Sequence, residues 1–239
     1  MIIFPAIDIK DSKCVRLIRG DFDKMTSYKN SPLDQAKLYF KNGFKNIHIV
    51  DLDGALKGKS SNSNIVQDIL KNLKLKIQIG GGIRTIDDIN NWVKSGVDKV
   101  IIGTAAVENK SLLKTACEKF KNKIAVSLDV KDGFIFLSGW KKQTNILAVD
   151  YVKEIENFGV SRIIFTDINK DGTKKGPNIK DAIELSNKVK IPFIISGGIS
   201  SIEDIKNIKS LKNKNIEGVI VGKSIYDGDI KINELAKQI

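Results

Sequence analysis

Two aspartates lie in matching contexts in the two halves of the chain, and their carboxyl groups are of the kind that exchange protons with a substrate. Asp8 follows the apolar run Ile2–Ile7, and Asp129 follows the run Ile124–Leu128. One carboxylate can accept a proton while a second carboxylic acid donates one, and each such group contributes about 10²- to 10⁴-fold to a rate. One of the two must then be protonated at neutral pH, which burial or a nearby like charge can arrange. A single aspartate after a strand more often caps a turn, but the matched pair favours acid-base catalysis.

Glycine-rich loops also recur in both halves. Gly80-Gly81-Gly82 and Gly197-Gly198 each follow an apolar run and directly precede a helical pattern. Glycine lets backbone amides approach a phosphate closely, and a helix N-terminus adds a favourable dipole. For one loop a tight turn is an equally good explanation, but the recurrence favours a ligand with two phosphates. The predicted cradle residues are Gly81, Gly82, Gly103 and Thr104 in the first half and Gly197, Gly198, Gly222 and Lys223 in the second.

Four further side chains are candidates for the site or for its support. Arg84 follows the first glycine loop, and because Ser200 stands in its place in the second half, we predict a substrate contact, with an ion pair to a loop carboxylate as the alternative. Trp140 follows a hairpin-like segment and is predicted either to stack on a planar ring or to pack its loop. Thr166 ends a strand with a hydroxyl that can steer a carboxylate, although strand-end threonines are more often structural. His48 is the only histidine and is interpreted as structural, so the sequence supports neither a histidine metal site nor a Ser-His triad.

These residues need a scaffold that brings them together, and the chain alternates short β-branched runs with amphipathic stretches, as a parallel βα sheet does. The predicted strands are Ile2–Ile7, Asn46–Val50, Lys76–Ile79, Lys99–Ile102, Ile124–Leu128, Arg162–Phe165, Phe193–Ile195 and Gly218–Val221. The predicted helices are Pro32–Asn42, Asn64–Asn72, Thr85–Ser95, Lys110–Lys121, Ile146–Phe158, Ile179–Lys188, Ser201–Lys209 and Ile230–Lys237. Two of the helices begin with capping-box patterns, Thr85 with Asp88 and Ser201 with Asp204.

An internal repeat selects among the α/β folds. The segment Ile79–Ile89 returns in nearly the same letters as Ile195–Ile205, and other landmarks recur in the same order. We therefore predict a single (β/α)8 TIM barrel spanning residues 1–239, built from two duplicated (β/α)4 halves at about 1–122 and 123–239. An open doubly wound sheet is the alternative, but it does not require one half to copy the other.

The expected barrel also predicts where the acidic residues lie. Barrel active sites occupy the C-terminal ends of the strands, and the loops after strands seven and eight often bind phosphate. Asp8, Asp51, Asp129 and Asp167 all stand where apolar runs stop. We therefore expect all four to point into one mouth.

Charge and composition limit the function classes. The net charge of +12 is spread over lysines along the helices, without aromatic residues between them or a dense basic block, so we expect a solvated surface that attracts an anionic substrate and no nucleic-acid partner. Cys14 and Cys117 have no metal-like spacing and are interpreted as small apolar residues. No basic leader or long apolar run is present, so the expectation is a soluble cytoplasmic protein with no membrane contact.

Six groups of short motifs run in order along the whole chain. They are Pro5-Ala6-Ile7-Asp8; Val50-Asp51-Leu52-Asp53-Gly54-Ala55; Gln78-Ile79-Gly80-Gly81-Gly82-Ile83-Arg84; Ser127-Leu128-Asp129; Thr166-Asp167-Ile168 with Asp171-Gly172-Thr173 and Gly176-Pro177-Asn178; and Gly218-Val219-Ile220-Val221-Gly222. Together they resemble the ProFAR isomerase family of histidine biosynthesis. The resemblance implies an Amadori rearrangement, in which the aminoaldose ring of a ribonucleotide-like bisphosphate opens and becomes an aminoketose.

The resemblance also implies residue roles. Asp129 would be the acid that protonates the ring oxygen, Asp8 the base that removes the C2′ proton, and Thr166 an auxiliary group. Arg84 and Trp140 would hold the carboxamide-imidazole end. The motifs further place Gly176 among the substrate-binding residues. A small-molecule bisphosphate would be the substrate, no metal or organic cofactor would be needed, and the chain would act as a monomer without an obligate protein partner.

Three alternatives stand beside this prediction. The cyclase subunit of imidazole glycerol phosphate synthase shares the duplication, but that family usually begins with a Pro-Cys-Leu-Asp-type motif and lacks the Val50–Ala55 segment found here. A dual-substrate isomerase that also acts on phosphoribosyl anthranilate has compatible motifs. A basic nucleic-acid-binding barrel without catalysis would show tight, salt-dependent DNA binding, and the scattered lysines count against it.

Overall fold

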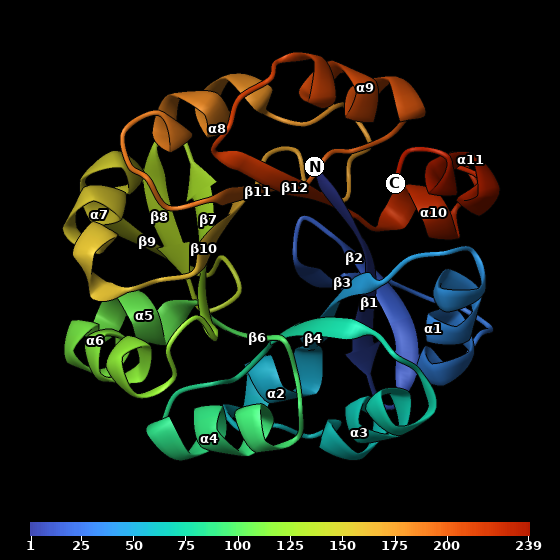
Figure 1. Ribbon diagram of the computed structural model, residues 1–239, viewed down its shortest axis with the longest axis horizontal. Coiled ribbons are helices and arrows are strands. Elements are labelled where there is room, and N and C mark those ends of the chain that lie inside the picture. Colours follow the sequence, from blue (N-terminus) through green and yellow to red (C-terminus); the bar gives the residue numbers. More distant parts are fainter.

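Eight parallel strands close into a ring in the computed structural model, which describes residues 1–239 (Figure 1). In ring order they are β1 (Ile2–Lys10), β4 (Asn46–Asp51), β5 (Lys76–Gly80), β6 (Lys99–Ile102), β7 (Ile124–Lys131), β10 (Arg162–Asp167), β11 (Phe193–Ser196) and β12 (Ile216–Val221). β7 pairs with β10 and β12 pairs with β1, so no edge of the ring is left open. The predicted (β/α)8 barrel is confirmed, and every predicted strand is present.

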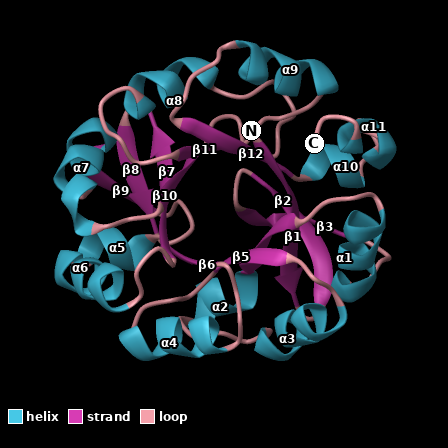
Figure 2. Ribbon diagram, viewed as in Figure 1, coloured by secondary structure: helices cyan, strands magenta, loops and turns pink.

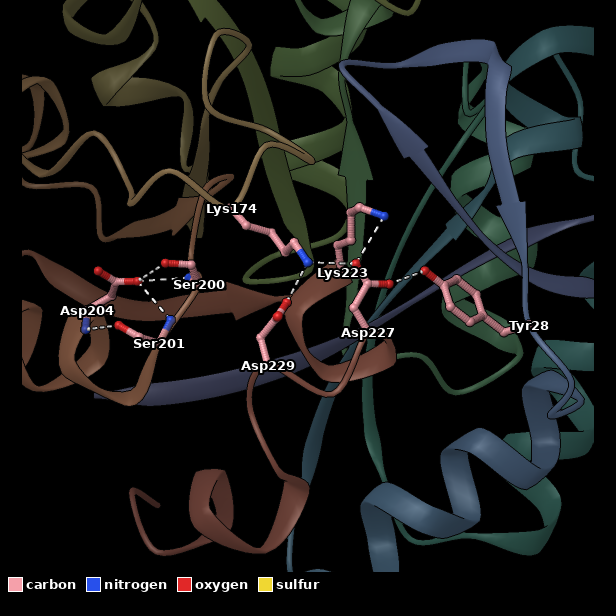
Figure 3. Close-up of polar contacts among 8 residues, drawn as sticks. All are labelled: Tyr28, Lys174, Ser200, Ser201, Asp204, Lys223, Asp227 and Asp229. Carbon is pink, nitrogen blue, oxygen red and sulfur yellow. Dashed lines mark hydrogen bonds and ion pairs between the residues drawn. The ribbon is translucent and has the colours of Figure 1, made fainter.

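Helices surround the strands on the outside of the barrel (Figure 2). They are α1 (Pro32–Lys41), α3 (Ser63–Asn72), α4 (Ile86–Lys94), α6 (Lys110–Lys119), α7 (Ala148–Glu154), α8 (Ile179–Ser186), α9 (Ile202–Ser210) and α11 (Ile232–Ala236). Both predicted capping boxes are present: Thr85 and Asp88 close the first turn of α4, and Ser201 and Asp204 close that of α9 (Figure 3). None of the helices combines the length and apolar character needed to cross a lipid bilayer.

The predicted helix Ile146–Phe158 differs most from the structure, and the last helix, predicted at Ile230–Lys237, spans only Ile232–Ala236. Residues 146 and 147 belong to a strand, β9 (Lys142–Leu147), and the helical segment then divides into α7 and a 3-10 turn at Glu156–Phe158. The apolar periodicity of the sequence includes Ile146 and Leu147 and so predicts a helix there. The backbone of Leu147 is instead extended, because this residue pairs with β8 (Phe134–Leu137).

Two antiparallel hairpins extend strands one and five of the ring. β1 continues into β2 (Lys13–Ile18) and β3 (Asp21–Ser27), and β7 continues into β8 and β9. The first hairpin was not predicted, because β3 carries mostly polar, exposed side chains and lacks an apolar alternation. Since strands one and five occupy equivalent positions in the two halves, the hairpins follow the duplication. Three short helices begin at the C-terminal ends of strands: α2 (Leu52–Lys57), α5 (Thr104–Glu108) and α10 (Lys223–Tyr226).

The buried apolar residues form two separate clusters. The larger one fills the layer between the sheet and the helices, and a smaller one, which includes Ala6, Ile101 and Ile164, fills the middle of the barrel. Successive strand residues point alternately outward and inward, so each strand contributes to both clusters. Only inward-facing residues at the C-terminal ends are therefore available to a site.

A polar layer closes the N-terminal end of the barrel. Arg162, the first residue of β10, donates hydrogen bonds from Nη2 to Glu217 Oε1 at 2.8 Å and from Nη1 to Gln78 Oε1 at 3.3 Å. Its guanidinium lies over the Phe4 ring. Lys99 is buried beside this group. Side chains thus fill the barrel floor, and the interior opens toward the other end.

Candidate active site

A cavity of about 340 Å³ opens at the C-terminal ends of the strands. Asp8 from β1, Asp129 from β7 and Thr166 from β10 all line it. β1 and β7 are four strands apart in the eight-strand ring, so the two predicted carboxyl groups approach the cavity from opposite sides. This arrangement matches an acid and a base acting on two faces of one ligand.

Arg16 is the ion-pair partner of Asp8. Its Nη1 donates a hydrogen bond to Asp8 Oδ2 at 2.8 Å, and its Nη2 donates one to the carbonyl oxygen of Ala6 at 2.6 Å. Burial raises the pKa of Asp8 overall, and the charge of Arg16 and its hydrogen bond oppose this rise. The guanidinium therefore stabilises the carboxylate form, which is the form a general base needs.

Asp129 lies in a different environment and has no cationic partner. Burial raises its pKa to about 6, and hydrogen bonding with Trp140 and Thr166 acts in the opposite direction. A carboxyl group with a pKa near 6 keeps a proton far more readily at neutral pH than an ordinary aspartate. The pKa of both groups is raised by burial, and the difference between them is the Arg16 partner of Asp8, which favours Asp8 as the base and Asp129 as the acid.

A third carboxyl group, which the sequence analysis did not select, shares the cavity. Asp171, in the loop after β10, lines the cavity with Asp8 and Asp129. Burial and the charges of these two aspartates raise its pKa to about 7, and Arg16 opposes the shift. A signal for it was present in the sequence, because the repeat places Ala55 at the equivalent position of the first half. Asp171, like Arg84, therefore has no counterpart in the other half of the chain.

The prediction that four strand-end aspartates share the mouth is wrong for Asp51 and Asp167. The Asp51 carboxylate is fully buried and accepts hydrogen bonds from the backbone amides of Gly54, Ser61 and Asn62 and from the Asn62 side chain. Asp167 accepts hydrogen bonds from the Asn169 amide and the Asn178 side chain. Both residues fix the loops that follow their strands.

Strand parity explains this difference. Asp51 continues the series Ile47 and Ile49, which packs in the cluster outside the barrel, whereas Val50 lines the cavity. Asp129 instead continues the inward series Ala125 and Ser127. Because neighbouring strand residues point to opposite faces, a shift of one position removes a carboxyl group from the mouth.

The glycine loops of both halves line the cavity in the same conformation. Gly81 and Gly82 have φ angles of 111° and 71°, and Gly197 and Gly198 have angles of 87° and 82°. A Cβ on Gly82 would lie 2.0 Å from the carbonyl oxygen of Gly54, and one on Gly198 would lie 2.3 Å from that of Gly176. Glycine is therefore required there by close backbone packing, and the absence of side chains also leaves the loop amides accessible to an anion.

The second part of each predicted cradle also matches between the halves. Gly103 precedes α5 and Gly222 precedes α10, with similar backbone angles. Thr104 and Lys223, the next residues, line the cavity. Gly176 does not line it, because its carbonyl oxygen packs behind Gly198.

Arg84, in the loop after β5, and Trp140, in the loop between β8 and β9, both line the cavity. The guanidinium of Arg84 lies against Gly58, where a Cβ would be 2.6 Å from Nη1. Trp140 packs on Gly20 at the tip of the β2–β3 hairpin, where a Cβ would be 2.7 Å from the indole. Its loop is held by a 2.9 Å hydrogen bond from the Ser138 amide to Thr104 Oγ1. The two hairpins therefore meet over the mouth of the barrel.

His48 lies at the base of the cavity and is neutral at physiological pH, because burial lowers its pKa to about 3. Its Nδ1 is 3.1 Å from the Gln78 amide nitrogen. No group of three or more histidine, cysteine or acidic side chains is arranged to hold a metal ion. Both cysteines are buried and unpaired.

The fold and the site define a (β/α)8-barrel enzyme with opposed carboxyl groups between two glycine loops. A family model described as "Histidine biosynthesis protein" matches residues 2–231, and the chain belongs to this family. A relative from Pelagibacter ubique is 57% identical over 239 residues, which cover 100% of this chain and 99% of the relative. Relatives from Oceanobacillus iheyensis and Caulobacter vibrioides are 44% and 43% identical, each over 98% of this chain and 97% of their own length. All three are named 1-(5-phosphoribosyl)-5-((5-phosphoribosylamino)methylideneamino)imidazole-4-carboxamide isomerase, the ProFAR isomerase.

Proposed function

We propose that this protein is an aldose-ketose isomerase that catalyses the Amadori rearrangement of ProFAR in histidine biosynthesis. The observation that carries the proposal is one cavity in which Asp8 and Asp129 approach from opposite strands between two glycine loops. Full-length relatives that bear the name of this isomerase support it. They also disfavour the cyclase alternative.

The two carboxyl groups divide the proton transfers. Asp129, with its raised pKa, donates a proton to the ring oxygen of the aminoaldose, and the ring opens to a protonated Schiff base. Asp8, hydrogen-bonded to Arg16, removes the C2′ proton in its carboxylate form, and the electrons move to give an enolamine. Tautomerisation of the enolamine, with a proton delivered to C1′, gives the aminoketose. Thr166 is the register partner of Asp129 in the pairing of β10 with β7 and would keep that carboxyl group oriented.

Asp171 is a second candidate for the proton donor. It shares the cavity with Asp8 and Asp129, and its pKa of about 7 keeps it substantially protonated at neutral pH. Comparing Asp129→Asn with Asp171→Asn separates the two roles: replacement of the acid abolishes turnover of ProFAR, whereas replacement of the other residue leaves a measurable rate.

Binding at both ends of the substrate holds the central sugar between the carboxyl groups. The amides around Gly81, Gly82, Gly103 and Thr104 would cradle one phosphate. Those around Gly197, Gly198, Gly222 and Lys223 would cradle the other. Arg84 and Trp140 would hold the carboxamide-imidazole ring. Such remote binding energy orients the reacting centre.

Within the proposal, the protein acts on a small molecule as a monomer, without an obligate partner, metal or organic cofactor. Within the proposal, residues 1–239 form one barrel domain, and the protein works in the cytoplasm. Size-exclusion chromatography with light scattering tests whether the active protein is a monomer. A dimer as the only active species would refute it.

Incubation with ProFAR, followed by the absorbance change of the product, tests the activity. A parallel incubation with phosphoribosyl anthranilate tests the dual-substrate alternative. Conversion of ProFAR alone identifies a dedicated isomerase, and conversion of both substrates identifies a dual enzyme. Conversion of neither by folded protein would refute the proposal.

A further inference from the structure

Asp227 lies just outside the cavity, at the C-terminal end of α10, and gathers three side chains around one carboxylate (Figure 3). Its Oδ2 is 3.0 Å from Lys174 Nζ and 3.2 Å from Lys223 Nζ, and its Oδ1 accepts a 2.8 Å hydrogen bond from the Tyr28 hydroxyl. These partners come from three separate parts of the chain, and both lysines line the cavity.

Lys174 connects this carboxylate to the loop that carries Asp171. The loop joins β10 to α8, and Lys174 adopts a positive φ of 56°, which costs energy for a residue with a side chain. Its Nζ also lies 2.7 Å from Asp229 Oδ2, so two carboxylates restrain one lysine (Figure 3). Since Asp171 is three residues away on the same loop, the restraint on Lys174 limits where Asp171 can lie.

Lys223 connects the same carboxylate to the second glycine cradle. It directly follows Gly222 and begins α10. Burial acts to raise the pKa of Asp227, but hydrogen bonds from Lys174, Tyr28 and Lys223 lower it overall, so the group is ionised at neutral pH. A carboxylate that stays ionised holds both ammonium groups on its side of the mouth.

A third connection runs toward Asp8. The Tyr28 ring packs on Tyr226 with 4.6 Å between centroids, and the Arg16 guanidinium lies 5.1 Å from the Tyr226 ring. Arg16 in turn pairs with Asp8. Asp227 is thus connected to Asp8 through Tyr28, Tyr226 and Arg16, and to the Asp171 loop through Lys174. It does not itself line the cavity.

We propose that Asp227 is a positioning residue, which fixes Lys174 and Lys223 and thereby holds the Asp171 loop and the second cradle in their working arrangement. The inference rests on the proposed function, and it assigns a role to a residue that touches no substrate.

The central test compares Asp227→Asn with Asp227→Glu. The asparagine keeps the size of the side chain but removes the charge that holds the lysines. We expect kcat for ProFAR to fall by about tenfold or more, since misplacement of a site by about 1 Å can cost on the order of 10²-fold, and KM to rise as well, because the second cradle binds a substrate phosphate. The glutamate keeps the charge and should recover most of kcat. Glu154→Gln, which breaks an exposed ion pair with Lys110 away from the mouth, is the matched control and should leave both constants unchanged.

A second measurement does not depend on catalysis. Trypsin cleaves after lysine, and the Asp227→Asn variant should be cut after Lys174 or Lys175 at least about threefold faster than the wild-type protein or the Glu154→Gln control. Circular dichroism confirms that each variant is folded. A kcat for Asp227→Asn within twofold of the wild type, or a raised KM with an unchanged kcat, would overturn the proposal, as would unchanged cleavage. A wild-type protein that fails to convert ProFAR would refute the proposed function instead and leave the cleavage result to decide on the restraint.

Discussion

Replacing Asp129 by asparagine should remove catalysis and, at the same time, make the protein more resistant to unfolding at high pH. The pKa of Asp129 is raised to about 6 in the folded protein from an ordinary value of 3.8, chiefly by burial. Because the folded-state value is the higher one, this carboxyl group supports folding when it is protonated, below about pH 4. That support is lost as the pH rises through 6, because the folded protein must then bury a charge that the unfolded chain exposes to water. Asparagine does not titrate and avoids this loss.

The size of the effect follows from the shift. About two pKa units correspond to about 3 kcal/mol of unfolding free energy. The carboxyl group faces the cavity and is partly exposed, so solvent screening should reduce the measured effect to about 1–2 kcal/mol. The difference in the free energy of unfolding between Asp129→Asn and the wild-type protein should therefore depend on pH. Relative to the wild type, the variant should be more stable at about pH 8 than at about pH 4.5 by this amount. Taking the difference between the two pH values cancels the effect of asparagine on packing.

Urea unfolding of both proteins at the two pH values measures this difference, with fluorescence and circular dichroism as separate probes to establish that the transition is two-state. Turnover of ProFAR is measured on the same samples. A substitution effect that is the same at both pH values would refute the assignment of Asp129 as a carboxyl group with a raised pKa. An active variant would remove it from the proton-donor role.

Three further substitutions test other parts of the structure. Asp8→Asn should abolish isomerisation while ProFAR still binds, as calorimetry would show, because asparagine cannot accept the C2′ proton; retained turnover would exclude Asp8 as the base. Asp51→Asn should lower the free energy of unfolding by about 1–3 kcal/mol in urea titrations, because the buried carboxylate accepts hydrogen bonds from three loop amides, and an unchanged midpoint would contradict its structural role. Gly82→Ala should cost more than about 2 kcal/mol, since its methyl group would lie 2.0 Å from the Gly54 carbonyl oxygen. Gly96→Ala, at a positive φ with nothing within 4 Å, is the matched control, and an equal loss in both would show that backbone strain alone is responsible.

The duplication made much of this fold predictable. Each strand of the ring carries a β-branched run, and the repeat placed equivalent runs in both halves, so the eight strands and the closed barrel could be predicted from the sequence. The hairpin that carries Arg16 could not, because β3 is largely polar and exposed and lacks an apolar alternation. β3 pairs with β2 through backbone hydrogen bonds, and these do not require a particular sequence.

The repeat is enough to predict Asp8 and Asp129 as site residues, but the side of the strand to which a side chain points decides whether another strand-end aspartate joins them. Asp8 and Asp51 look alike as aspartates that end apolar runs, but they differ in parity relative to the outward-facing core residues. Counting alternate positions would have separated them before the structure was known. The contacts of Asp227 lie beyond such reasoning, because its partners Tyr28 and Lys174 are distant in the sequence and meet only through the closed ring.

The polar layer at the barrel floor determines how substrate enters the barrel and how product leaves it. Arg162, Gln78 and Glu217 plug the lower end with side chains that bind one another, so the barrel has a single entrance. Product must leave by the route through which the next substrate arrives, and the two molecules exclude each other. Product inhibition should accordingly be competitive, and the time that product takes to depart sets an upper limit on turnover however fast the proton transfers become.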